Sequence, residues 1–307
     1  MSGWTILLAM LPILGGVLLT VWCLAVVLLW WQQDRMIFPG WGFKLATEAS
    51  GLAPGDERLA WTMPDGVGLV GGLRRARGPS RGLLLICGGN AEETDWRLRQ
   101  VGELAPDCDV ATFFYRGFGP SGGQPSQDAI MADAALIRDD LVARLRPRRV
   151  LAVGFSLGSG VAAQLARLRP LDGLILVTPF DSIAGVAGDR YPWVPVRWLL
   201  RHPFRSDRAL AKRSLPVAVI GAADDLVVPP ARTRRLIAVL RQPVLVRWIE
   251  HADHVSIYDE PSYRQAFRDA VTALLADPRP RRPPLRQPPP SCRRACARAD
   301  PSRPGGR

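Results

Sequence analysis

Short apolar runs alternate with helical patterns along most of this chain, and this alternation restricts the fold more than any other feature. Gly82–Cys87 and Val150–Gly154 are continuous apolar runs, as expected of strands buried on both faces. Further strands are predicted at 58–63, 67–73, 110–114, 174–177, 216–220 and 244–249. Helices are predicted at 95–104, 126–145, 157–168, 231–240 and 262–275. Such alternation predicts a mostly parallel sheet with helices on both faces.

An uncharged segment near the N-terminus is long enough to cross a bilayer. It runs for 26 residues, from Ile6 to Trp31, whereas a hydrocarbon core of about 30 Å needs about 20 residues. Trp4 stands at one end and Trp30 and Trp31 at the other, as in an interfacial belt. A cleaved signal peptide would have a basic start, a shorter apolar region and a small-residue cleavage site, which this segment lacks. We therefore expect an uncleaved anchor.

The chain is then divided into an anchor at 1–34, a catalytic domain at 35–276 and a Pro/Arg-rich tail at 277–307 that is expected to be disordered. Within the domain the pattern weakens between Pro179 and Ser214, where Pro192 and Pro195 interrupt any helix. A short cap is expected there, at about 180–213. Arg35 and Lys44 follow the anchor, which favours a cytoplasmic catalytic domain.

The net charge of +12 does not indicate a nucleic-acid partner. The tail contains nine arginines and two aspartates, a net charge of +7, which leaves +5 for the rest of the chain. No basic stripe with interleaved aromatic residues is present. The five cysteines include no CxxC pair and no zinc-ligand spacing, so neither a metal nor a cofactor is predicted. Nothing in the sequence indicates the oligomeric state.

The segment Gly154-Phe155-Ser156-Leu157-Gly158 has the form G-x-S-x-G. It lies between a predicted strand and a predicted helix, the context of a nucleophile elbow. Glycines allow the sharp turn, and the N-terminus of the following helix favours a developing negative charge. Ser156 is therefore the predicted nucleophile.

A serine nucleophile needs a base and an acid, in the chain order serine, acid, histidine. His251 and His254 both follow the last strand, and His254 is preferred because it lies deeper in the loop. Asp224 and Asp225 both follow the preceding strand, and only one of them can orient the imidazole.

An oxyanion hole requires two N–H donors. One is expected from Leu157, directly after the nucleophile. The other is expected from Asn90, in the Gly88-Gly89-Asn90-Ala91 turn after the Gly82–Cys87 strand.

These motifs occur in an order that resembles the membrane-anchored bacterial α/β-hydrolases of the serine aminopeptidase-like group. The likeness also includes Tyr115-Arg-Gly-Phe-Gly-Pro-Ser-Gly-Gly123, and it runs from about Arg35 to Leu275. It implies an α/β-hydrolase fold. The family pattern D-x-x-V-P falls on Asp225, and the pattern before the histidine falls on His254, so the resemblance favours this pair. Cys87 stands where many relatives have histidine, which weakens inference about the substrate.

The expected reaction is two-step acyl transfer on a carboxylic ester or thioester, by Ser156, Asp225 and His254, with a small-molecule or acylated substrate. Two alternatives stay open: a serine peptidase or amidase, and an α/β-hydrolase scaffold without catalysis.

Overall fold

The folded domain of the chain is built on one eight-stranded sheet. The structure is a computed structural model and describes residues 3–42, 51–90 and 93–276, so the predicted tail lies outside the described residues. The strands are β1 (Glu57–Thr62), β2 (Gly68–Arg74), β3 (Leu83–Cys87), β4 (Asp109–Phe113), β5 (Val150–Phe155), β6 (Gly173–Val177), β7 (Val217–Ala222) and β8 (Pro243–Ile249). Their order is β1-β2-β4-β3-β5-β6-β7-β8.

All pairs from β4 to β8 are parallel, whereas β1 pairs with β2 and β2 with β4 in antiparallel fashion. The predicted mostly parallel sheet is therefore confirmed. The β1–β2 hairpin turns where Asp65 accepts a hydrogen bond from the N–H of Val67, in the Pro64-Asp65-Gly66 segment.

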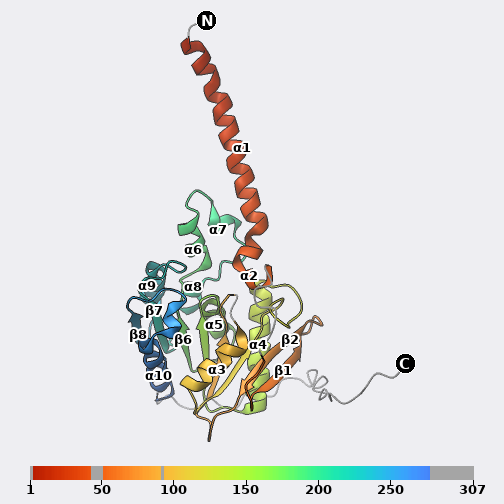
Figure 1. Cartoon of the computed structure of the whole chain (residues 1–307), viewed down its shortest axis with the longest axis vertical. Helices are drawn as coiled ribbons and strands as arrows, with labels where there is room; N and C mark the ends of the chain where they lie inside the picture. The colour runs from red at the N-terminus through yellow and green to blue at the C-terminus, as the bar shows by residue number, and fades with distance from the viewer. Residues whose placement is uncertain (1–2, 43–50, 91–92, 277–307) are drawn as a thin grey trace, which may run out of the picture.

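Helices cover both faces of the sheet (Figure 1). They are α1 (Gly3–Ile37), α2 (Pro39–Gly42), α3 (Thr94–Leu104), α4 (Gln127–Leu145), α5 (Leu157–Leu168), α6 (Ile183–Arg190), α7 (Val196–Leu199), α8 (Ser206–Leu210), α9 (Pro230–Val239) and α10 (Pro261–Ala276), with a 3₁₀ turn at Ser256–Asp259. The longest domain helix, α4, begins where the side chain of Ser126 accepts a hydrogen bond from the N–H of Ala129.

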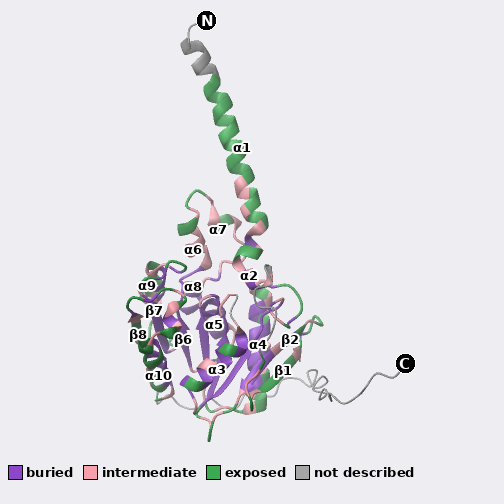
Figure 2. Ribbon diagram, in the orientation of Figure 1, coloured by how far each residue is buried: buried purple, intermediate pink, exposed green. Residues whose placement is uncertain are grey.

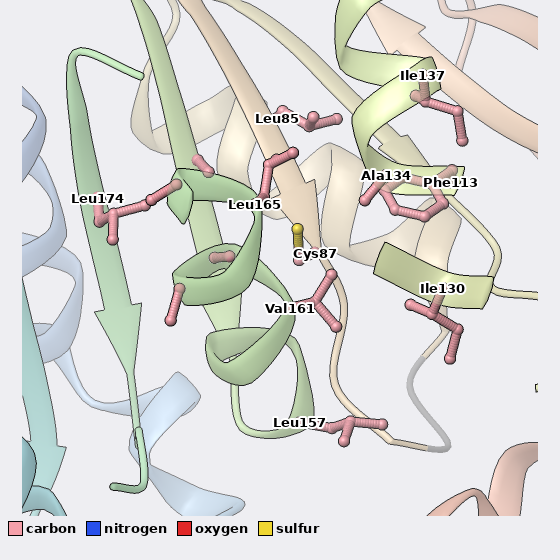
Figure 3. Packing of buried hydrophobic residues seen from close by; sticks show 14 of the residues in the cluster. Leu85, Cys87, Phe113, Ile130, Ala134, Ile137, Leu157, Val161, Leu165 and Leu174 are labelled. Atoms are coloured by element: carbon pink, nitrogen blue, oxygen red, sulfur yellow. The ribbon is translucent and has the colours of Figure 1, made fainter. Parts of the chain in front are cut away.

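Two hydrophobic cores result from the period of the buried strands. In β3, Leu83, Leu85 and Cys87 belong to one core, and Leu84 and Ile86 belong to the other. The first core contains residues of α4 and α5, and Figure 3 shows its packing around Val161 and Leu165. The second contains residues of α3 and α10. Because β3 is buried on both faces, its sequence is a continuous run of apolar residues.

Among the described elements, the N-terminal helix α1 extends away from the sheet (Figure 1). Its 35 residues include Pro12 near the N-terminus. The stretch Met10–Ile37 is long and apolar enough to cross a membrane by length and composition, with a mean hydropathy of 2.5. Much of it is exposed, and contact with the domain is confined to its C-terminal turns, beside α6 and α7 (Figure 2).

Candidate active site

Ser156 occupies a sharp turn between β5 and α5. Its backbone has φ 48° and ψ −115°, a conformation that side-chain-bearing residues rarely adopt. The turn is held because the N–H of Ser156 donates to the carbonyl of Val177 at 3.0 Å, and the carbonyl of Ser156 accepts from the N–H of Ser159 at 2.9 Å. The neighbouring strand therefore fixes the backbone of the serine.

The two glycines of the motif are required by close backbone contacts. A Cβ at Gly158 would lie 1.9 Å from the carbonyl oxygen of Cys87. A Cβ at Gly154 would lie 2.5 Å from the carbonyl oxygen of Gly158. These distances leave no room for any other residue type, so the G-x-S-x-G spacing follows from the packing of α5 against β3 and β5.

A continuous chain of hydrogen bonds links the serine to a histidine and an aspartate. Nε2 of His254 lies 2.8 Å from Oγ of Ser156, and Nδ1 of His254 lies 2.7 Å from Oδ2 of Asp225. The other carboxylate oxygen of Asp225 accepts from the N–H groups of Val227 and Val228, at 2.9 and 2.7 Å. Asp225 is only 3% exposed, so its carboxylate is oriented by the backbone and directs one oxygen at the imidazole.

The alternative residues lie outside this arrangement. Asp224 is exposed, and its N–H donates to the carbonyl of Ala252. His251 is also exposed and has φ 58° in the turn after β8. His202 lies in the segment after α7, where burial lowers the pKa of its imidazole. The Nδ1 atom of His202 accepts from the N–H of Gln127.

The two predicted oxyanion donors flank the serine. Leu157 begins α5, and the first N–H groups of a helix have no acceptor within that helix. Asn90 follows β3 and borders the same cavity as Ser156. Its side-chain amide donates to the carbonyl of Ile37 at 2.7 Å, which connects this turn to the end of α1. Ala91 and Glu92, the next two residues, lie outside the described residues.

Cys87 is close to this turn but is not a rival nucleophile. It is fully buried at the end of β3. Burial raises the pKa of its thiol to about 12, so the thiol stays protonated near neutral pH.

The Tyr115–Gly123 loop contacts the turn that contains Asn90. The hydroxyl of Tyr115 donates to the carbonyl of Gly88 at 2.8 Å, which fixes the turn that contains Asn90. Arg116 forms a two-pronged ion pair with Asp133, at 2.5 and 2.7 Å. These contacts are internal to the domain, so the loop stabilises the turn and does not line the cavity.

A cavity of about 460 Å³ opens beside Ser156 and His254. Its walls are mostly apolar and come from the end of α1, from α6 and α7, and from the loops after β6 and β7. The lining residues include Val26, Leu29, Ile37, Phe180, Ile183, Val186, Val196, Leu199 and Val228. The sequence predicts a cap at about 180–213, and several wall residues lie in it, but it does not predict that the end of α1 forms a wall, because in the sequence those residues are ordinary apolar positions.

Comparison with known proteins agrees with the fold. Residues 82–215 match the family model described as the alpha/beta hydrolase fold. The chain is 34% identical over 236 residues to an uncharacterised Mycobacterium tuberculosis protein, Rv2307c, covering 74% of this chain and 83% of that protein. The chain belongs to the α/β-hydrolase fold family.

Two further proteins resemble this chain, one in sequence and one in structure. The lysophosphatidylserine lipase ABHD12 of Xenopus tropicalis is 32% identical over 194 residues, which cover 52% of this chain and 49% of the lipase. The chain thus spans about half of that protein. The structure of the Pyrococcus furiosus esterase Pf2001 has a TM-score of 0.61 at 17% identity and covers 75% of this chain and 98% of the esterase. At this identity the likeness concerns the fold alone.

Proposed function

We propose that the protein is a serine hydrolase that cleaves a carboxylic ester or thioester through an acyl-enzyme. The observation that supports this most directly is the hydrogen-bonded chain from Ser156 through His254 to Asp225, at 2.8 and 2.7 Å. Distances of this size are what transfer of a proton from nucleophile to base requires. The strained backbone of Ser156 supports the same role, because such strain gathers at active sites.

In the proposed first step, Oγ of Ser156 attacks the substrate carbonyl while Nε2 of His254 takes the hydroxyl proton. Asp225 accepts a hydrogen bond from Nδ1 and stabilises the imidazolium that forms. The N–H groups of Leu157 and Asn90 hold the oxyanion. His254 then returns the proton to the leaving alcohol or thiol. In the second step His254 takes a proton from water, the resulting hydroxide attacks the acyl-enzyme, and Ser156 recovers its proton.

The cavity favours an ester or thioester over an aminoacyl substrate. Its described walls include no aspartate or glutamate that would hold a substrate ammonium group, and Arg190 is the only arginine or lysine among them. The similarity to a lysophosphatidylserine lipase points to esters as well. A scaffold without catalysis is disfavoured by the intact geometry at Ser156, because idle sites have no need for a strained nucleophile turn.

A comparison of ester and amide substrates tests this proposal. Purified full-length protein is expected to hydrolyse p-nitrophenyl butyrate, and Ser156→Ala is expected to lower kcat by at least about 10³-fold. Aminoacyl p-nitroanilides are expected to react far more slowly than the ester. A faster reaction with the anilides would favour a peptidase, and no Ser156-dependent reaction with either would favour a scaffold.

We also propose that α1 anchors the protein in a membrane. The apolar stretch Met10–Ile37 has the required length and composition. Its C-terminal turns contact the catalytic domain, as when the side chain of Gln33 hydrogen-bonds to the carbonyl of Leu199 at 3.3 Å. A cleaved signal peptide is not expected to form part of the folded domain.

A further inference from the structure

One face of the last turns of α1 forms a wall of the cavity that contains Ser156. Val26, Leu29, Trp30, Gln33 and Ile37 line this cavity. Each of them is three or four residues from another member of the set, which places them on a single helix face. Leu28 lies on the other side of the helix and is 52% exposed. The membrane-anchor helix and the active site therefore share one surface.

This wall is attached to the cap by two sets of hydrogen bonds. The first is at Gln33, which is 6% exposed and whose Oε1 accepts from the N–H of Arg201 at 2.8 Å. The second is at Trp22, eleven positions earlier, whose indole N–H donates to the carbonyl of Trp193 at 3.1 Å. Because the contacts lie about 16 Å apart along the helix, α1 is held parallel to the cavity rather than touching it at one point.

The size and chemistry of the cavity suit one aliphatic chain. The wall opposite α1 is formed by apolar side chains of α6 and α7, including Ile183, Val186 and Leu199. A 150 Å³ cavity holds benzene, so each carbon atom occupies roughly 25 Å³. The volume of about 460 Å³ then corresponds to roughly 18 carbon atoms. This is enough for one long acyl chain and too little for two.

Exposed tryptophans lie near the outer end of this cavity, on α1 and on the cap. Trp22 is 40% exposed, and on the cap Trp193 is 48% and Trp198 75% exposed. Tryptophan concentrates at the membrane–water interface. Val26, at the outer end of the cavity wall, lies one helical turn from Trp22.

We propose that α1 forms half of an acyl-chain site, and that the substrate is a single-chain aliphatic ester that moves from the bilayer along α1 to Ser156. The inference rests on the proposed hydrolase function and names its substrate class. Leu29 is the residue of this wall that determines how long an acyl chain the cavity accepts. Leu29 lies two turns, or about 12 Å, before Ile37 at the inner end of the wall. A larger side chain there shortens the space available to the acyl chain.

The test compares two neighbouring leucines on opposite faces of α1. Full-length protein in phosphatidylcholine vesicles is assayed with p-nitrophenyl esters from butyrate to palmitate. For wild type, kcat/KM is expected to rise about threefold to fourfold per added methylene until the cavity is filled. In Leu29→Trp the ratio of the palmitate to the butyrate value is expected to fall at least tenfold, as expected when several methylenes lose their contacts. The matched control, Leu28→Trp, is expected to keep the wild-type ratio.

Binding of cis-parinaric acid, a fluorescent single-chain fatty acid, to Ser156→Ala provides a readout without catalysis. The additional Leu29→Trp change is expected to weaken this binding, and the additional Leu28→Trp change is not. If the ratio and the binding are the same in Leu29→Trp as in its parent, the acyl-chain site is wrong although the hydrolase function stands. If no ester reacts and binding still depends on Leu29, the hydrolase function is wrong and the acyl-chain site stands.

Discussion

At the scale of single residues, the orientation of Asp225 depends on two backbone N–H groups. The N–H groups of Val227 and Val228 donate to Oδ1 of Asp225. The second carboxylate oxygen, Oδ2, lies 2.7 Å from Nδ1 of His254. The pattern D-x-x-V-P thus has a physical reason, because the turn that follows the aspartate supplies both donors. Asp224 is exposed one position earlier, outside the reach of this turn.

The two aspartates are therefore expected to respond very differently to the same substitution. In Asp225→Asn the amide oxygen can still accept from Val227 and Val228, while the NH₂ group faces the imidazole and imposes the wrong tautomer. We expect kcat for p-nitrophenyl butyrate to fall by about 10⁴-fold. Asp224→Asn is expected to stay within about threefold of wild type, since exposed substitutions usually shift free energies by less than about 0.5 kcal/mol.

Steady-state kinetics of the two variants decide this point, with circular dichroism to verify that both are folded. An equal loss in both variants, or a greater loss in Asp224→Asn, would contradict the assignment of Asp225.

At the scale of elements, the sequence predicts the strands and helices of the sheet well, because their signals are local. The run Gly82–Cys87 predicts a buried strand, and β3 is observed at Leu83–Cys87. Ser126 predicts the start of a helix, and its side chain caps α4. The order of strands in the sheet and the two antiparallel pairings at its edge depend on long-range packing, which no local pattern encodes.

The contacts of α1 illustrate what sequence alone does not reveal. A helix that is apolar on all sides has no amphipathic phase, so the face that meets the domain is not distinguishable in the sequence. The tryptophan positions predict a boundary of the anchor at Trp30 and Trp31. In the structure, α1 continues to Ile37, and the face that includes Trp30 lines the cavity. The hydrogen bond from Gln33 to Leu199 of α7 connects residues 166 positions apart.

The proposed anchor role of α1 gives a prediction about membrane fractions. Full-length protein is expected to stay in the membrane pellet after an alkaline carbonate wash, because its apolar helix is far longer than the roughly 20 residues that a bilayer core requires. Mass spectrometry of the pelleted protein is expected to find peptides from the N-terminal segment. Release into the supernatant, with a chain that begins after α1, would show that the segment is a cleaved signal peptide.

At the scale of the whole molecule, the candidate site lies where three parts of the chain meet. The carboxyl ends of parallel strands carry Ser156, Asp225 and His254, as ligand sites in open α/β sheets do. The segment with α6 and α7 covers one side, and the end of α1 covers another (Figures 1 and 2). Because all three parts border one cavity, the proposed membrane anchor and the candidate catalytic residues belong to the same surface.

The central claim is that Ser156 is an activated nucleophile, and covalent labelling tests it most directly. Full-length protein is treated with a fluorescent fluorophosphonate, and the modified peptide is identified by mass spectrometry. The expected result is one label per chain, on Ser156, lost in Ser156→Ala and strongly slowed in His254→Ala. Absence of labelling in folded wild-type protein, or equal labelling of Ser156→Ala, would contradict the account.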